Sequence, residues 1–164
     1  MQFLAKDDIA APISYVFAQI TDFAAFERQA MRRGADVRRI DTLPRAGIGN
    51  VWSVRFLFRG RERDLRAEVT GFDPPNGLTL TAVAQNLSVV TVIELVALSR
   101  THTRLTIRLD LAASGLATRL LLQSLKLAKG GLTRKFEARV SEFAQDVQAR
   151  YQRRPGQGQG QGQG

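Results

Sequence analysis

Few residues in this chain have side chains suited to acid–base, nucleophilic or metal chemistry. His102 is the only histidine and cysteine is absent, so the sequence cannot supply a Cys–His nucleophile or a zinc site built on these ligands. The carboxylates Glu68, Glu94 and Asp110 fall on the polar side of alternating stretches, turned away from the apolar residues. The sequence therefore predicts no catalytic residue, no bound metal and no cofactor.

The residues that could bind a ligand are almost all apolar. In residues 50–59, alternation places the aromatic side chains on one face, and large side chains on one face can line a pocket or simply pack a core. Thr91 and Arg63 are the polar candidates on the same side, Arg63 at the end of the inward stripe. The candidate ligand-binding residues are Trp52, Val54, Phe56, Phe58, Arg63, Leu65, Thr91, Leu132 and Phe136.

A hairpin positions most of these side chains. Residues 50–59 and 62–72 are predicted as antiparallel strands joined by a two-residue turn, Gly60-Arg61, because glycine at the first turn position favours type II′. A slip by one residue would turn every side chain to the other face. The predicted register pairs Phe56 with Leu65, Val54 with Ala67 and Trp52 with Val69, and makes Arg63 a neighbour of Phe58.

The remaining elements follow from the same patterns. A strand at residues 2–9 precedes two short helices, the second capped by Asp22 and burying Phe23 and Phe26. Further strands are expected at residues 35–42, in the stretch after the Asp73–Gly77 turn, at 87–98 and from Leu105. A helical stripe runs from Leu116 to Tyr151, with a kink expected at Gly130-Gly131.

These elements predict an α+β fold: a curved antiparallel sheet of six to seven strands wrapped around a long C-terminal helix, with two short helices after the first strand. The domain is expected to span residues 1–152, followed by a disordered Gln-Gly tail at 153–164.

Composition limits the partners. The net charge is +9, which favours anionic partners such as acidic lipid headgroups, but can also reflect an arginine-rich solvated surface. Exposed aromatics for base stacking are not expected, which argues against nucleic acid. We expect a soluble cytoplasmic protein, because the N-terminus shows no signal peptide and no apolar run is long enough to cross a bilayer.

One outward surface is unusually apolar. If Leu87, Val89, Ile93 and Leu95 point inward, then Val90, Val92 and Val96 point outward. Apolar patches often mark contacts. We expect this surface to be covered by a partner chain, a homodimer being the candidate assembly, or by the N-terminal segment.

Several local strings, in their order, resemble the START-like (SRPBCC) superfamily, whose fold is called helix-grip. They are Ala11-Pro12 with Val16-Phe17, Thr21-Asp22-Phe23, Asp73-Pro74-Pro75 and Thr103-Arg104-Leu105. The resemblance covers residues 3 to about 150. It implies an apolar cavity between the concave face of the sheet and the C-terminal helix.

Three functions stay open at this point. The first is a non-enzymatic binding or carrier domain for a small hydrophobic molecule, lipid-like or polycyclic. The second, implied by the resemblance, is an enzyme of the polyketide cyclase or dehydratase type that works mainly by cavity shape. The third is a structural or protein-interaction domain with a filled core. Members of one fold differ widely in function.

Overall fold

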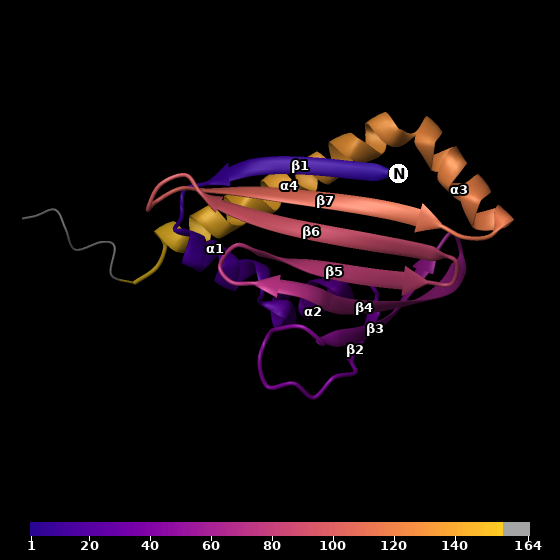
Figure 1. Ribbon diagram of the computed structural model, residues 1–164, viewed down its shortest axis with the longest axis horizontal. Coiled ribbons are helices and arrows are strands. Elements are labelled where there is room, and N and C mark those ends of the chain that lie inside the picture. The colour runs from indigo at the N-terminus through magenta and orange to yellow at the C-terminus, as the bar shows by residue number, and fades with distance from the viewer. Residues whose placement is uncertain (156–164) are drawn as a thin grey trace, which may run out of the picture.

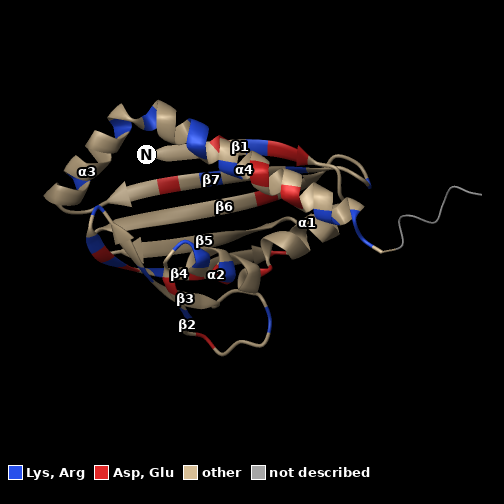
Figure 2. Ribbon diagram, turned by 180° about the vertical axis from the view of Figure 1, so that it is seen from behind, with Lys and Arg blue, Asp and Glu red and all other residues tan. Residues whose placement is uncertain are grey.

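The computed structural model describes residues 1–155 and shows one seven-stranded antiparallel sheet with α1, α2 and α4 on one face and α3 beyond one end (Figures 1 and 2). Spatial order in the sheet is β1-β7-β6-β5-β4-β3-β2. The elements are β1 (Gln2–Ile9), α1 (Ile13–Ile20), α2 (Phe23–Arg32), β2 (Asp36–Arg39), β3 (Val51–Phe58), β4 (Arg61–Asp73), β5 (Gly77–Ala84), β6 (Leu87–Ala97), β7 (Thr103–Ala113), α3 (Leu116–Leu127) and α4 (Lys129–Gln152). The predicted α+β helix-grip class is confirmed. The predicted Gln-Gly tail lies mostly outside the described residues.

The two short helices begin where side-chain chemistry favours them. Asp22 caps α2 as predicted, because its carboxylate accepts a hydrogen bond from the backbone N–H of Ala25 at 3.2 Å. Phe23 is buried as expected, whereas Phe26 is 38% exposed. Phe26 differs from the prediction because α2 lies across the sheet with that side chain at the rim of a hollow, not against the sheet.

Two groups of buried residues divide the interior. The larger one joins β1, β6 and β7 to α1 and to the C-terminal half of α4, through Ile9, Leu105 and Val147. The smaller one joins Phe23 on α2 to Trp52 and Val69 on β3 and β4. The C-terminal helix therefore covers the β1 side of the sheet, α1 lies against β6, and α2 covers the side of β2 to β4 (Figure 2).

The β3–β4 hairpin forms, but its register differs from the predicted one by two residues. Phe56 lies opposite Arg63, not opposite Leu65, and Phe58 lies opposite Arg61. The turn residues are Arg59 and Gly60, with φ of 52° and 73°. Positive φ at both positions is the type I′ pattern, whose twist matches the strands. Because the shift is even, every side chain keeps its predicted face.

The C-terminal helical stretch is two helices and not one kinked helix. α3 ends at Leu127, and the single residue Ala128 separates it from α4. α3 turns away past the end of the sheet (Figure 1). Gly130 and Gly131 lie within the first turn of α4. The break falls just before the glycine pair, where the chain has left β7 and must turn back to reach β1.

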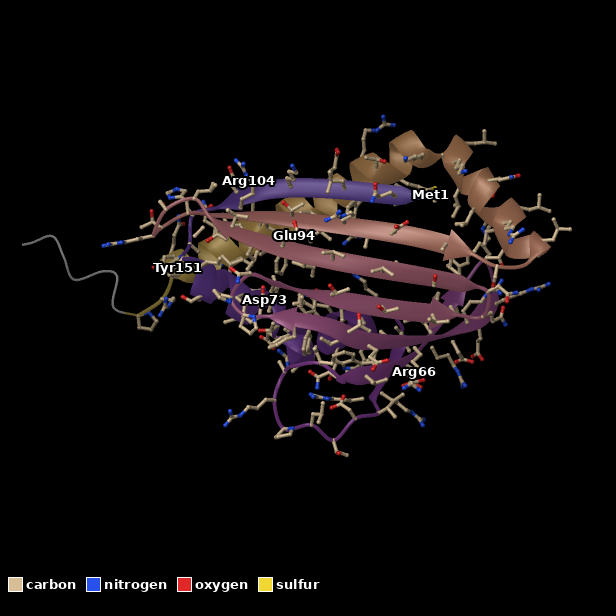
Figure 3. All side chains as sticks on the ribbon, viewed as in Figure 1. Met1, Arg66, Asp73, Glu94, Arg104 and Tyr151 are labelled. Carbon is tan, nitrogen blue, oxygen red and sulfur yellow. The ribbon has the colours of Figure 1, made fainter. Side chains whose placement is uncertain are left out.

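The outward face of the sheet carries the predicted valines and several ion pairs. Val90 and Val92 are half-buried and Val96 is 56% exposed. The N-terminal segment does not cover them, because it forms the edge strand β1. Cover by a second copy remains a prediction. On this face Arg108 Nη2 lies 3.4 Å from Glu94 Oε1, and Arg104 pairs with Asp8 at 2.8 Å (Figure 3).

Candidate functional site

The inner face of the sheet follows from the cross-strand register. Trp52, Ala67, Ala82 and Val89 lie in line from β3 to β6 and therefore share this face. Many side chains on the face, such as Val54, are only half-buried, since α4 lies over β1 and not over the middle of the sheet. The inner face therefore carries apolar side chains suited to packing, but the helices cover it incompletely.

An apolar cavity of about 270 Å³ lies between this face and the two short helices. Its sheet wall comes from β2 to β6 and its helix wall from α2 and the last residue of α1. The lining residues are Ile20, Phe23, Phe26, Glu27, Ala30, Val37, Trp52, Val54, Ala67, Leu80 and Ile93. A concave, mostly apolar site with few polar groups is the usual form of a small-molecule site.

Glu27 is the single charged residue in the cavity wall. Its Oε1 accepts a hydrogen bond of 2.6 Å from the indole Nε1 of Trp52. Trp52 is only 6% exposed, so this bond satisfies a buried donor and at the same time fixes the carboxylate at the wall. The cavity thus presents an acceptor group inside an otherwise apolar lining.

The indole is held on its other sides as well. The ring of Phe23 meets it edge-on with centroids 5.0 Å apart, and the Arg39 guanidinium lies 5.9 Å from its centroid. Arg39 is itself paired with Asp41 at 3.1 Å, which raises the pKa of Arg39, and Glu27 adds to that rise. Trp52 is therefore held in the wall by contacts with Phe23, Arg39 and Glu27.

Asp41 organises the loop beside this wall. Its carboxylate accepts hydrogen bonds from the backbone N–H of Val51 at 2.8 Å and of Leu43 at 3.0 Å, and from Asn50 Nδ2 at 3.2 Å. The Arg39 guanidinium, helped by these donors, holds the pKa of the Asp41 carboxyl well below its usual range. The loop of residues 40–50 is consequently fastened to β3 next to Trp52.

A second hollow, a cleft of about 390 Å³, adjoins the cavity toward α4. The two share Ile20, Phe26 and Ile93. Phe26 also meets Phe143 of α4 with ring centroids 5.9 Å apart. The rim of this cleft is polar, with Gln29, Arg33, Arg139, Glu142, Asp146 and Arg150. Phe26 therefore lies at the boundary between an apolar interior and a charged rim.

The structure gathers only part of the predicted site. Trp52 and Val54 line the cavity, Leu65 lies on the inner face opposite Val54, and Phe56 lines a separate hollow beyond α2. Phe58 is 41% exposed near the hairpin tip.

The remaining four predicted residues also lie outside the cavity lining, so that only Trp52 and Val54 of the predicted set line it. Arg63 is inward, and within residues 1–155 its Nε has no hydrogen-bond partner. Thr91 shares the inner face, in line with Leu80. Leu132 and Phe136 lie on α4, and Phe136 packs edge-on against Phe3 at 6.2 Å. They miss the cavity because α4 crosses the β1 side of the sheet.

Sequence reasoning missed the contribution of α2. Phe23, Phe26, Glu27 and Ala30 recur at the three- and four-residue spacing of one helix face. That spacing by itself indicates only ordinary core packing. The carboxylate within the stripe is the sign that this face borders something other than a filled core.

Outside this region the described residues offer little other chemistry. His102 is exposed in the β6–β7 turn, 2.9 Å from the Thr101 hydroxyl. Residues 1–155 contain no cluster of three His, Cys, Asp or Glu side chains able to hold a metal ion. Among the helices in this range, none is both long and apolar enough to span a bilayer.

Comparison with known proteins defines the fold. Neither the protein-family models nor the curated protein sequences contain a match. Among solved structures, the Zhui aromatase/cyclase from Streptomyces sp. R1128 matches 96% of this chain and 98% of its own, with a TM-score of 0.70 and 12% identity. TTHA0849 from Thermus thermophilus matches 92% of this chain and 99% of its own (TM-score 0.65, 14% identity). A START superfamily protein from Mycobacterium smegmatis matches 86% and 97% (TM-score 0.57, 12% identity). The resemblance predicted from the sequence is confirmed at the level of fold.

Proposed function

We propose that this chain, which has the START-like helix-grip fold, binds a small hydrophobic molecule in the cavity between α2 and the inner face of the sheet. The observation that carries the proposal is the apolar cavity itself, about 270 Å³ in volume and lined by residues of α1, α2 and β2 to β6. The pocket is partly open to the surface, so its apolar side chains lack packing partners on the open side. A ligand seated there would supply the missing contacts.

The lining narrows the chemistry of the ligand. Aromatic and branched aliphatic side chains favour a flat or branched apolar body. The Glu27 carboxylate beside Trp52 favours a ligand that donates a hydrogen bond, such as a phenol or alcohol. A ligand carboxylate next to Glu27 would be repelled. A hydroxylated polycyclic molecule therefore fits this wall better than a fatty acid does.

Trp52 makes the proposal testable, because it is the only tryptophan of the chain. Titration with 2-hydroxyanthraquinone is expected to quench its emission to saturation, whereas palmitate is expected to give a weaker response. A variant that fills the cavity, Ala67→Leu, is expected to weaken binding with little loss of stability. Overpacking a filled core would instead cost about 1–3 kcal/mol.

A matched control separates the cavity from the rest of the inner face. Ala84→Leu adds the same side chain on the same face of the sheet, at the far end of β5 and outside the cavity lining. Ala84→Leu is expected to leave the titration unchanged. Phe56→Trp is also expected to bind as the wild type does, and its binding is followed by the ligand's absorbance because the variant has a second tryptophan. Equal effects of Ala67→Leu and Ala84→Leu, or a strongly destabilised Ala67→Leu protein that binds nothing, would contradict a binding cavity.

A second candidate function is an enzyme of the cyclase or dehydratase type, and Glu27 is the observation that favours it. A carboxylate fixed by a hydrogen bond in an apolar wall can act as a general base toward a bound substrate. Glu27→Gln would keep an acceptor for Trp52 but could not take up a proton. Retained binding with lost turnover of a poly-β-ketone substrate would support this function, and turnover that survives the substitution would argue against it.

A further inference from the structure

The helix α3 has two apolar faces, and the protein itself uses only one. At about 100° per residue, Leu116, Leu120 and Leu127 fall within an arc of about 40°. They are 75%, 55% and 92% exposed. Leu122 is buried on the opposite side, and Leu121 and Leu125 beside it are half-buried. A helix that is apolar on opposite sides is expected to be covered on both, so the exposed stripe of leucines lacks its cover within residues 1–155.

The charges around this stripe have one sign. From residue 111 to residue 136 the sequence contains no Asp or Glu, and the five charged side chains are Arg119, Lys126, Lys129, Arg134 and Lys135. In Figure 2 the ribbon of α3 is coloured blue at its basic residues and nowhere red. On the helical wheel, Arg119 and Lys126 lie about 60° and about 80° from Leu116 on one side of the exposed leucines, beyond Gln123. An apolar stripe bordered by cations is the pattern of helices that lie in a lipid headgroup layer.

A second element presents the same combination at the same end of the sheet. Leu57, at the end of β3, is 73% exposed, and Phe58 next to it is 41% exposed. The Arg59 guanidinium lies 5.5 Å from the ring of Phe58. Both α3 and the β3–β4 turn lie at the end of the sheet where β5 turns into β6 (Figure 1), and the backbone N–H of Ser114 donates to the carbonyl of Asn86 in that turn at 2.7 Å.

We propose that this end of the molecule docks on an anionic lipid bilayer, with Leu116, Leu120 and Leu127 of α3 inserted among the headgroups and the neighbouring Lys and Arg side chains against lipid phosphates. The inference goes beyond the proposed ligand binding and does not depend on the cavity. Docking is peripheral, because α3 has 12 residues and a span needs about 20.

Charge complementarity decides whether an anionic bilayer, a second copy of the chain or a nucleic acid covers the exposed leucines of α3. A second copy seated on the same face would bring like charges together, since a two-fold interface places a patch against itself. Nucleic acid would match the charge but would leave three leucines in water. An anionic bilayer satisfies both features together.

The test uses the full chain and vesicles of phosphatidylcholine with about 30% phosphatidylglycerol, an anionic fraction that supplies the surface potential. Co-sedimentation is expected with these vesicles and not with pure phosphatidylcholine vesicles, and it is expected to fall as salt is raised. The triple variant Leu116→Ser, Leu120→Ser, Leu127→Ser is expected to lose at least about tenfold in partition coefficient. The control Leu4→Ser, Val96→Ser, Leu98→Ser removes side chains that are 47%, 56% and 47% exposed elsewhere, and is expected to bind as the wild type does.

Absence of cysteine permits a site-resolved measurement. Leu120→Cys labelled with an environment-sensitive nitrobenzoxadiazole dye is expected to shift to the blue on the anionic vesicles, while Leu98→Cys labelled in the same way is not. Circular dichroism of each variant verifies folding. Equal binding of the two triple variants, equal dye shifts at both positions, or no binding of wild type to the anionic vesicles would overturn the proposal. A lipid-free dimer that the α3 variant dissolves, without vesicle binding, would overturn it too and assign the stripe to a second copy.

Discussion

The indole Nε1 of Trp52 donates a hydrogen bond to Oε1 of Glu27 across 2.6 Å, and this bond joins the sheet wall of the cavity to its helix wall. Trp52 lies on β3 and Glu27 on α2, 25 positions apart in the sequence. The bond places a proton acceptor in an apolar lining. It also fixes the one tryptophan that the protein contains.

Removing this bond is expected to cost stability and to leave the fold intact. Glu27→Ala leaves a buried indole N–H without its acceptor, at a cost of about 1–3 kcal/mol. Glu27→Gln keeps an acceptor oxygen and is expected to lose about 1 kcal/mol or less. Urea unfolding followed by circular dichroism measures both. A Gln variant as unstable as the Ala variant would show that the charge, and not the hydrogen bond, stabilises this contact.

The stability of the fold is expected to depend on pH through the ionisation of Asp41. Because Arg39 lowers the pKa of Asp41 in the folded protein, this carboxylate stabilises the fold fully above its unfolded pKa of about 3.9. That stability is lost as the pH falls from there toward the lower folded value. Asp41→Asn should therefore be less stable at neutral pH and lose less stability than the wild type between about pH 4 and pH 2.

The exposed Asp110 supplies the control for this prediction, because it makes no ion pair within residues 1–155. Asp110→Asn should follow the wild-type curve in thermal melts at a series of pH values. Parallel wild-type and Asp41→Asn curves below about pH 4 would mean that the Asp41 network does not contribute to folding.

A buried threonine fastens the turn after β1. Thr103 is fully buried, and its Oγ1 donates to the carbonyl of Ala11 at 2.8 Å. Thr103→Val keeps the shape but leaves that carbonyl without this donor, so a loss of about 1–3 kcal/mol is expected. The control is Thr106→Val, on the outward face of the same strand. If both variants unfold at the same urea concentration, the hydrogen bond is not a stabilising one.

The start of β5 requires glycine. Gly77 has a φ of 154°, and a Cβ at this position would overlap the backbone carbonyl of Ile93 on the neighbouring strand. Gly77→Ala must therefore push β5 away from β6, with an expected loss of at least about 3 kcal/mol. Gly47→Ala meets open space at an ordinary φ and is expected to change stability by about 0.5 kcal/mol or less. Comparable melting temperatures for the two variants would contradict the strand spacing seen here.

The sequence by itself determined the kinds of elements and the faces of the strands. Alternation with a period of two assigned Trp52, Val54 and Phe56 to one side, and this assignment survived a register error. Both candidate turns, Gly60-Arg61 and Arg59-Gly60, preserve that alternation, because they differ by two residues in pairing. Only the backbone conformation at Arg59, which positive φ makes left-handed, selects between them.

The tertiary structure decided which faces meet. A helical stripe shows that α4 buries one side, but not that it lies over β1, where Phe136 meets Phe3 and leaves the middle of the sheet to α2. The same limit applies to Glu27, because a carboxylate within a helix stripe shows that the face is unusual but not which element lies opposite it. Periodicity is a property of one segment, whereas a cavity is a property of the space between several, and that space depends on contacts between residues far apart in the chain.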